Sequence, residues 1–206
     1  MRESGGISSQ LAQSKREALA QLEQQTRQNM RQKKLVFGEG NPDAKLVMVG
    51  EAPGGEEEKR GRPFVGRAGQ LLDQFLEECS FERNELWITN VVKWHPTASA
   101  DGRQRTRAPN RAEIDLHVGW LMKELEIICP KIILCLGNIS AKALIDRRFK
   151  MTSEHGQWRE GPFGIVAVAT FHPAYVLRQI GRRDLVEQWV RQDLEKVKER
   201  YEQPDE

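Results

Sequence analysis

The chain has 206 residues, 38% of them hydrophobic, with 32 basic and 30 acidic side chains and a net charge of +2. This length suits one α/β domain with a substantial core, and the net charge decides little about partners. The three cysteines have no metal-binding spacing and no apolar run is long enough to span a membrane, so we expect a monomer in a reducing, cytoplasmic compartment, with no metal site and no membrane partner.

The N-terminal segment, residues 1–34, is predicted to be a helical arm. It is rich in Gln, Ala, Lys, Arg and Glu, and its apolar positions are sparse. These residues favour a helix, while the thin apolar stripe indicates a helix laid on the surface of the domain. The compact domain is predicted to span residues 35–203.

Four apolar runs in this domain are typical of buried strands, at residues 46–49, 86–92, 131–136 and 165–171. Segments with helical periodicity separate or follow them, at residues 70–78, 113–128, 138–146 and 183–201. Strands that alternate with helices through short connections predict a parallel sheet between two helical layers. The expected fold is α/β, a three-layer α/β/α sandwich with a four-stranded parallel sheet.

The stretch from Gly50 to Gly69, GEAPGGEEEKRGRPFVGRAG, follows the first of these strands. The carboxyl end of a parallel strand is where such sheets place their ligands. Gly50 allows close backbone approach beside the carboxylate of Glu51, and Phe64 is an aromatic residue on a Gly/Pro-bounded loop. Ala52, next to Glu51, is also expected to contact the ligand. The stretch predicts a site for a ligand with a flat face and an anionic backbone.

Two other strands also end in a polar residue, Asn90 and His172. If the ligand is a nucleotide swung out of a strand, Phe64 would stack on its base and Asn90 would pair with the edge of the base. His172 would face the oxygen that gains charge as the base departs, and Glu51 would hold a water and stabilise a cationic sugar. Structural alternatives stay open, since backbone groups can satisfy a buried Asn and a His-Pro can cap a turn.

Basic residues cluster near these loops, which indicates a polyanionic partner, although a solvated face is the ordinary explanation for any one cluster. A long loop, residues 93–112, carries one of the clusters and is therefore expected to be functional or mobile. The side chains expected to contact a nucleic-acid backbone are Arg67, Arg105, Arg107, Arg178 and Arg182.

Five pieces of the sequence, in this order, resemble the uracil-DNA glycosylase superfamily, most closely its family 4. They are VFGEGNPDAKLVMVGEAPG, GRPFVGRAGQLL, ITNVVK, PKIILCLG and HPAYVLR, and the resemblance covers residues 35–178. It implies hydrolytic removal of a base from DNA, as in base-excision repair. It also implies catalytic roles for Glu51, Glu57 and His172, and a place for Leu177 and Arg178 where family members push a wedge into the helix and touch the backbone.

The chain departs from family 4 in two places. That family holds an iron–sulfur cluster with four cysteines, but here the N-terminal arm has none, Trp94 stands at the third ligand position and His117 near the fourth. We therefore expect no iron–sulfur cluster and no other cofactor. The loop after Trp94 also carries SADGRQRT before APNR, a longer form than the family's usual loop.

Three functions are compatible with these residues. The leading hypothesis is a monofunctional DNA glycosylase that excises uracil, because no lysine stands where a strand-cutting Schiff base would be expected. A second hypothesis keeps the reaction and changes the base to hypoxanthine or a modified cytosine, such as a phage DNA base. A third is a catalytically inactive DNA-binding or damage-sensing module.

Overall fold

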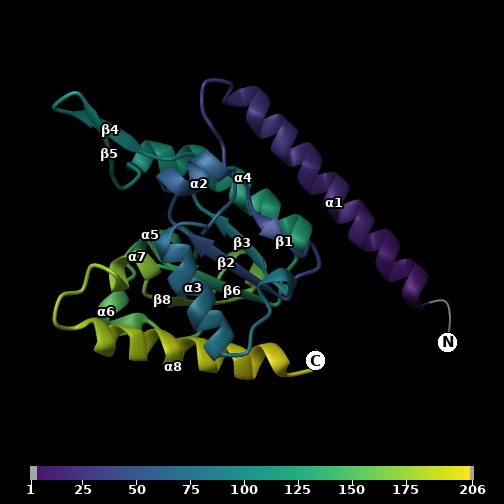
Figure 1. The fold of residues 1–206 in the computed structure, drawn as a ribbon. Coiled ribbons are helices and arrows are strands. Elements are labelled where there is room, and N and C mark those ends of the chain that lie inside the picture. Colours follow the sequence, from purple (N-terminus) through teal and green to yellow (C-terminus); the bar gives the residue numbers. More distant parts are fainter. Residues whose placement is uncertain (1–3, 205–206) are drawn as a thin grey trace.

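Four parallel strands form the centre of the sheet in a computed structural model, which describes residues 4–204 of the chain (Figure 1). In spatial order they are β3 (Trp87–Asn90), β2 (Leu46–Gly50), β6 (Ile132–Leu136) and β8 (Val166–Thr170). All residues of β2, β3 and β6 are buried, as expected for parallel strands covered on both faces. The predicted parallel strands are therefore confirmed.

Two short antiparallel strands extend this sheet beyond the four strands that the sequence predicts. They are β1 (Glu39–Gly40), which pairs with β3, and β7 (Arg159–Glu160), which pairs with β8. Each has only two residues and neither is buried, so no apolar run marks them in the sequence. The complete sheet has six strands in the order β1, β3, β2, β6, β8, β7.

Alternate residues of the central strands build two hydrophobic clusters on opposite faces of the sheet. Leu46 and Met48 of β2 belong to the cluster beneath α3 and α8, whereas Val47 and Val49 belong to the cluster beneath α4 and α5. This alternation follows from the two-residue period of a strand. The result is the predicted three-layer α/β/α sandwich.

The helical segments agree with the predicted ones to within a few residues, and several short turns of helix join them. The α-helices are α1 (Ser4–Asn29), α2 (Gly55–Arg60), α3 (Arg67–Glu78), α4 (Arg111–Ile128), α5 (Asn138–Leu144), α6 (Met151–Glu154), α7 (Pro173–Val176) and α8 (Arg183–Glu202). Two 3-10 turns, Arg83–Glu85 and Pro162–Gly164, complete the described helices. In the described part of the chain, no helix combines the length and the apolar character needed to cross a membrane.

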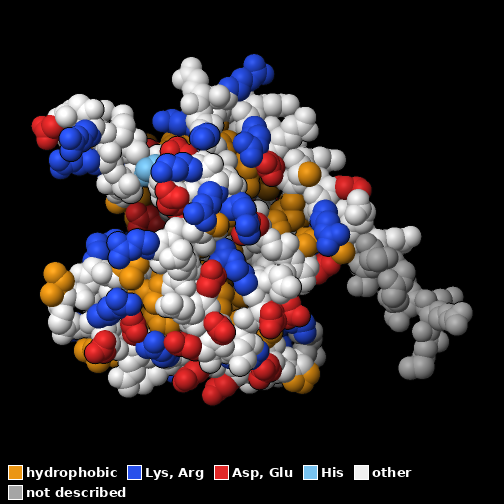
Figure 2. Space-filling view, in the orientation of Figure 1, with side chains coloured by type: hydrophobic (Ala, Val, Ile, Leu, Met, Phe, Trp, Pro, Cys, Tyr) orange, Lys and Arg blue, Asp and Glu red, His pale blue; other side chains and the backbone are white. Residues whose placement is uncertain are grey.

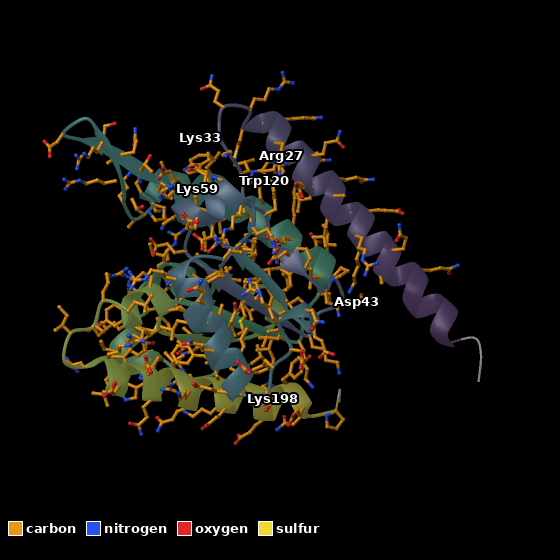
Figure 3. All side chains as sticks on the ribbon, in the orientation of Figure 1. Arg27, Lys33, Asp43, Lys59, Trp120 and Lys198 are labelled. Atoms are coloured by element: carbon orange, nitrogen blue, oxygen red, sulfur yellow. The ribbon has the colours of Figure 1, made fainter. Side chains whose placement is uncertain are left out.

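The arm predicted at the N-terminus is helix α1, which lies beside α4 and carries its N-terminal end away from the body (Figure 1). Lys15 pairs with Asp43 at 3.0 Å, and the guanidinium of Arg27 lies 4.7 Å from the ring centre of Phe37. Figure 3 shows Arg27 and Asp43 where the arm meets the body. Polar and cation-π contacts thus supplement the thin apolar stripe of this helix.

The long loop expected at residues 93–112 is in part a β-hairpin. Strands β4 (Thr97–Ala100) and β5 (Arg103–Thr106) pair across Asp101 and Gly102, which have φ angles of 51° and 72°. Two successive residues with positive φ match the twist of a two-residue hairpin, and Asp-Gly is a preferred sequence for that turn. The hairpin projects from the body beside α2 (Figure 1).

Phe75 on α3 tests the packing of the sandwich, because its side chain is fully buried in the cluster between α3, α8 and the sheet. We expect Phe75→Ala to lower the free energy of unfolding by about 3–5 kcal/mol, through lost burial and the cavity that remains. Urea-induced unfolding measures this. The exposed neighbour Gln74 provides the matched control, and Gln74→Ala should change the free energy by less than about 0.5 kcal/mol. Equal effects of the two substitutions would contradict this packing.

Candidate active site

The carboxyl ends of the central strands open into one cavity of about 880 Å³. Gly50 is the register partner of Asn90, so the ends of β2 and β3 lie level, and Glu51 and His172 follow the ends of β2 and β8. Glu51, Phe64, Asn90 and His172 all line the cavity. Parallel pairing therefore brings together four side chains that are up to 121 residues apart in the sequence.

The floor of the cavity depends on the missing side chain of Gly50. A Cβ atom at this position would lie 2.4 Å from Oδ1 of Asn90 and 2.5 Å from Cζ of Phe64. Neither distance is compatible with van der Waals contact, so only glycine lets the amide and the aromatic ring meet above the strand end. Ala52, also predicted to lie at the ligand, lines the same cavity and is partly exposed.

Asn90 has a hydrogen-bond acceptor that no group in the described part of the chain satisfies. Its residue is 3% exposed, and its Oδ1 atom is buried without a partner. A buried acceptor left without a donor costs free energy, so natural proteins rarely keep one unless a ligand or water completes it. The side chain that carries this acceptor lines a cavity large enough for a small ligand.

His172 caps α7 and is held in one tautomer. The backbone N–H of Ala174 donates to Nδ1 of His172 at 3.0 Å, so the proton of the neutral ring is on Nε2. Burial, with a smaller effect from the nearby Arg178 cation, lowers the pKa of His172 to about 4. The ring is thus a neutral donor at physiological pH, and it stacks on Phe64 with 5.6 Å between ring centres.

Glu51 is a half-buried carboxylate on the other side of the cavity. Burial raises the pKa of Glu51 above its ordinary value of 4.5, and the positive charge of Arg178 opposes that rise. A carboxylate with a raised pKa in a cleft is typical of a group that exchanges protons or stabilises a developing cation.

Glu57 stabilises the loop that presents Phe64. One carboxylate oxygen accepts the backbone N–H groups of Val65 and Gly66 at 3.0 and 2.7 Å, and the other accepts that of Gly54 at 3.1 Å. Phe64 itself has a positive φ of 51°, which is unfavourable for an aromatic residue. Glu57 therefore has a structural task at this site, while the catalytic role that the resemblance implies stays a prediction.

Comparisons with known proteins agree with this geometry. The family described as "Uracil DNA glycosylase superfamily" matches residues 37–195. The chain belongs to this superfamily. It is 39% identical over 165 residues to a type-4 uracil-DNA glycosylase of Thermotoga maritima, covering 80% of this chain and 81% of the relative.

Two further relatives extend the comparison within the superfamily. A type-4 uracil-DNA glycosylase of Pyrobaculum aerophilum is 40% identical over 154 residues, or 71% of this chain and 75% of the relative. A type-5 uracil-DNA glycosylase of Thermus thermophilus is 28% identical over 161 residues, or 71% of this chain and 72% of the relative. Membership in the superfamily makes the chain a DNA glycosylase, with DNA as its partner.

The basic residues predicted to contact DNA divide into two groups in this glycosylase. Arg67, Arg105, Arg178 and Arg182 are exposed, and Arg178 lines the cavity. Arg107 instead forms a two-pronged ion pair with Glu113 of α4, at 2.6 and 2.8 Å, which lowers the pKa of that carboxyl to about 2. Arg107 thus anchors the β4–β5 hairpin, and a contact between Arg107 and DNA stays a prediction.

Figure 2 shows the surface hollowed between the hairpin and the body below it, with basic side chains on both sides. Leu177, expected to wedge into DNA, is half-buried and packs against the core cluster of α3 and α8. Its insertion into DNA stays a prediction. Three residues further along the chain, Ile180 is 98% exposed and projects from the same loop.

Sequence reasoning missed part of the cavity wall, which comes from the segment between α5 and α7. Phe149, Phe171 and Tyr175 line it with apolar surface, and Lys142 and Lys150 lie at its exposed rim. The aromatic residues lie beside predicted strands and helices and read as ordinary core positions. The two lysines are exposed helix-end or loop residues, for which the sequence offers no distinctive signal.

Trp94 and His117 occupy the region where the family-4 resemblance would place cluster ligands. Their rings pack edge to face with 4.4 Å between centres, and Nδ1 of His117 accepts the backbone N–H of Lys93 at 3.2 Å. Cys79, Cys129 and Cys135 lie at the end of α3, at the end of α4 and inside β6. Among the residues that the structure describes, no three His, Cys, Asp or Glu side chains form a group that could bind a metal ion.

The contacts of Glu57 predict a local loosening on substitution. Glu57→Gln removes the charge-assisted acceptance of three backbone N–H groups, so we expect a loss of stability of about 1–3 kcal/mol. Hydrogen exchange of the Val65 and Gly66 amides should become faster. The adjacent Glu56 provides the control because its exposed carboxylate contacts only Lys59 and Arg60 among the ion pairs of α2, and Glu56→Gln should leave both amides protected. Unchanged exchange in Glu57→Gln would contradict the structural task of Glu57.

Proposed function

We propose that this chain is a monofunctional uracil-DNA glycosylase, which hydrolyses the N-glycosidic bond of a flipped-out uracil and leaves an abasic site. The observation that carries the proposal is the buried, unpartnered Oδ1 atom of Asn90 at the end of the cavity. Uracil presents an N–H donor at N3 next to an acceptor at O4, which complements the oxygen and nitrogen of an Asn side chain. Cytosine has no hydrogen at N3, so it would leave this oxygen unpaired.

Phe64 and Asn90 would hold the flipped base. The ring of Phe64 offers a flat apolar face, and its strained loop is fixed by Glu57. A rigid stacking surface and one complementary amide are sufficient to orient a base that has left the helix. The names of the type-4 relatives, at 39% and 40% identity, support uracil as that base.

His172 would stabilise the departing base. As the bond between N1 and C1′ breaks, its electrons move into the uracil ring and charge develops on O2. The Nε2–H group of the neutral His172 ring can donate to that oxygen without releasing a proton, and its tautomer is set by Ala174. A preorganised donor of this kind is typically worth roughly 100- to 1000-fold in rate.

Glu51 would act on the sugar side. Its carboxylate can stabilise the cationic sugar and hold the water whose oxygen bonds to C1′. The water gives up one proton, and the uracil anion takes one at N1, so the products are neutral uracil and an abasic site. Burial raises the pKa of Glu51, and the positive charge of Arg178 opposes this rise, which favours the carboxylate form that this role requires.

We extend the proposal to an enzyme that works without an iron–sulfur cluster, as a monomer, in the cytoplasm. The pair of Trp94 and His117 supports the first point, because these residues stand where the family-4 resemblance would place cluster ligands and neither carries the thiolate that holds an iron–sulfur cluster. In this chain Arg107, Trp94 and His117 tie the hairpin segment to α4 through side-chain contacts. These contacts supply the local cross-link that a cluster would otherwise provide.

The proposal is tested with single-stranded oligonucleotides that each carry one uracil, hypoxanthine or modified cytosine, followed by alkali cleavage of abasic sites. We expect cleavage at uracil, reduced at least about 100-fold by His172→Ala and by Glu51→Gln. Gln74→Ala, which alters only an exposed residue of α3, serves as the control. Cleavage at another base with none at uracil would overturn the choice of base, and a borohydride-trapped adduct would overturn the monofunctional assignment. Binding of DNA without cleavage of any base would favour an inactive module.

The pH dependence follows from the two shifted groups. Lowering the pH protonates Glu51 first, because its pKa lies above 4.5, whereas His172 stays neutral until about pH 4. We therefore expect kcat/KM to fall on the acid side with the apparent pKa of Glu51. Arg178→Met removes the charge that lowers this pKa, so the acid limb should move to higher pH.

Arg182 gives the matched control for the position of the acid limb, since it does not contribute to either pKa shift. Arg182→Met should leave the acid limb in place, even if weaker DNA binding lowers the whole curve. The pH profile is measured in single-turnover excision assays. A limb that stays fixed in Arg178→Met would mean that Arg178 does not set the protonation of Glu51.

A further inference from the structure

A buried ion pair, Lys93 and Glu124, contacts the backbone of Asn90. Lys93 and Glu124 are 2% and 5% exposed, and Nζ of Lys93 lies 2.6 Å from Oε2 of Glu124. The two other donor positions of Nζ are also used, by Oγ1 of Thr89 at 2.6 Å and by the backbone oxygen of Asn90 at 3.0 Å. Glu124 in turn accepts from Trp87 at 2.8 Å and from Thr89 at 3.1 Å.

The contribution of this ion pair to the free energy of unfolding does not by itself account for its presence in the core. Removing two charges from water is expensive, and buried ion pairs can often be replaced by apolar side chains of similar volume without loss of stability. In this chain Nζ of Lys93 donates to three acceptors and both carboxylate oxygens of Glu124 accept hydrogen bonds. A network with its polar atoms paired in this way holds its members in one arrangement. The member closest to the cavity is the backbone of Asn90.

The side chain of Asn90 depends on its backbone for its direction, because its Oδ1 atom has no hydrogen-bond partner among the residues that the structure describes. Two backbone bonds tie the residues after Asn90 to the end of β2, from Val91 N–H to Gly50 O and from Val92 N–H to Glu51 O, both at 3.0 Å. Lys93 supplies a bond to the carbonyl of Asn90 itself. The position of Lys93 is fixed by Glu124 and by His117, two residues on one face of α4.

We propose that Lys93, held by Glu124, is a positioning residue that fixes the peptide of Asn90 and thereby sets the choice of base. This inference rests on the proposed function of Asn90 as the base reader. Loss of the pair lets the carbonyl of Asn90 rotate, and the amide of its side chain then meets the base edge in more than one orientation. Excision of uracil becomes slower, and discrimination against cytosine becomes weaker.

The test removes both charges together, so that no unpaired charge stays buried. In the variant Lys93→Met/Glu124→Gln, we expect single-turnover excision of uracil to fall about 10- to 100-fold, the effect of a misplaced reacting group. The ratio of uracil to cytosine excision should fall as well. In an Asn90→Ala background, the same two substitutions should change the rate by less than about twofold, since residues that act through one another are not additive.

Leu125→Ala is the matched control for a purely structural effect. Leu125 is fully buried on α4 next to Glu124, but it contributes no hydrogen bond to the network. Its loss lowers stability without touching Asn90, so excision measured well below the melting temperature should keep the wild-type ratio of uracil to cytosine. A double variant that behaves like Leu125→Ala, or that slows the Asn90→Ala enzyme by its full factor, would overturn the proposal.

A second readout keeps the inference separate from the proposed function. The side-chain amide resonances of Asn90, identified by their loss in Asn90→Ala, should broaden or split in Lys93→Met/Glu124→Gln and stay single in Leu125→Ala. Unchanged resonances would overturn the positioning role even in an active enzyme. Conversely, a wild-type protein that excises no uracil would overturn the proposed function, while the resonances would still report whether Lys93 fixes Asn90.

Discussion

The absence of a side chain at Gly50 is the constraint on which the cavity depends. Parallel pairing sets Gly50 level with Asn90, and the loop held by Glu57 places Phe64 above both. A single Cβ at residue 50 would overlap the amide oxygen and the aromatic ring at once. The aromatic face of Phe64 and the amide of Asn90 therefore meet at one point of the cavity. Their meeting depends on the register of β2 and β3, on Gly50 and on the loop held by Glu57.

Helix α4 provides the platform behind this arrangement. Glu113, His117 and Glu124 are spaced along one helical face and contact Arg107, the backbone of Lys93 and its Nζ atom. The same face therefore anchors the root of the β4–β5 hairpin and the end of β3. Side chains on a helix are positioned more precisely than side chains on a loop. The contacts from α4 therefore explain how the ends of the β4–β5 hairpin, which line the cavity, are held in place.

The sequence predicts the central sheet well because four apolar runs are long enough to identify, and polar residues at their ends identify the site. It does not predict β1 and β7, which are too short and too exposed to leave a pattern. Asp101-Gly102 is a turn signal that indicates the hairpin, although the charge of the surrounding loop is its more prominent feature. The network of Lys93 and Glu124 joins residues 31 positions apart, and pairing at that range is visible only once the fold brings α4 against β3.

Arg178 acts on the pKa values of two groups that line the same cavity, Glu51 and His172. Burial disfavours the charged form of both side chains, so it lowers the pKa of His172 and raises the pKa of Glu51. The cation of Arg178 lowers both pKa values. This cation therefore acts against burial at Glu51 and in the same direction as burial at His172, so one exposed arginine at the cavity influences the protonation of both groups.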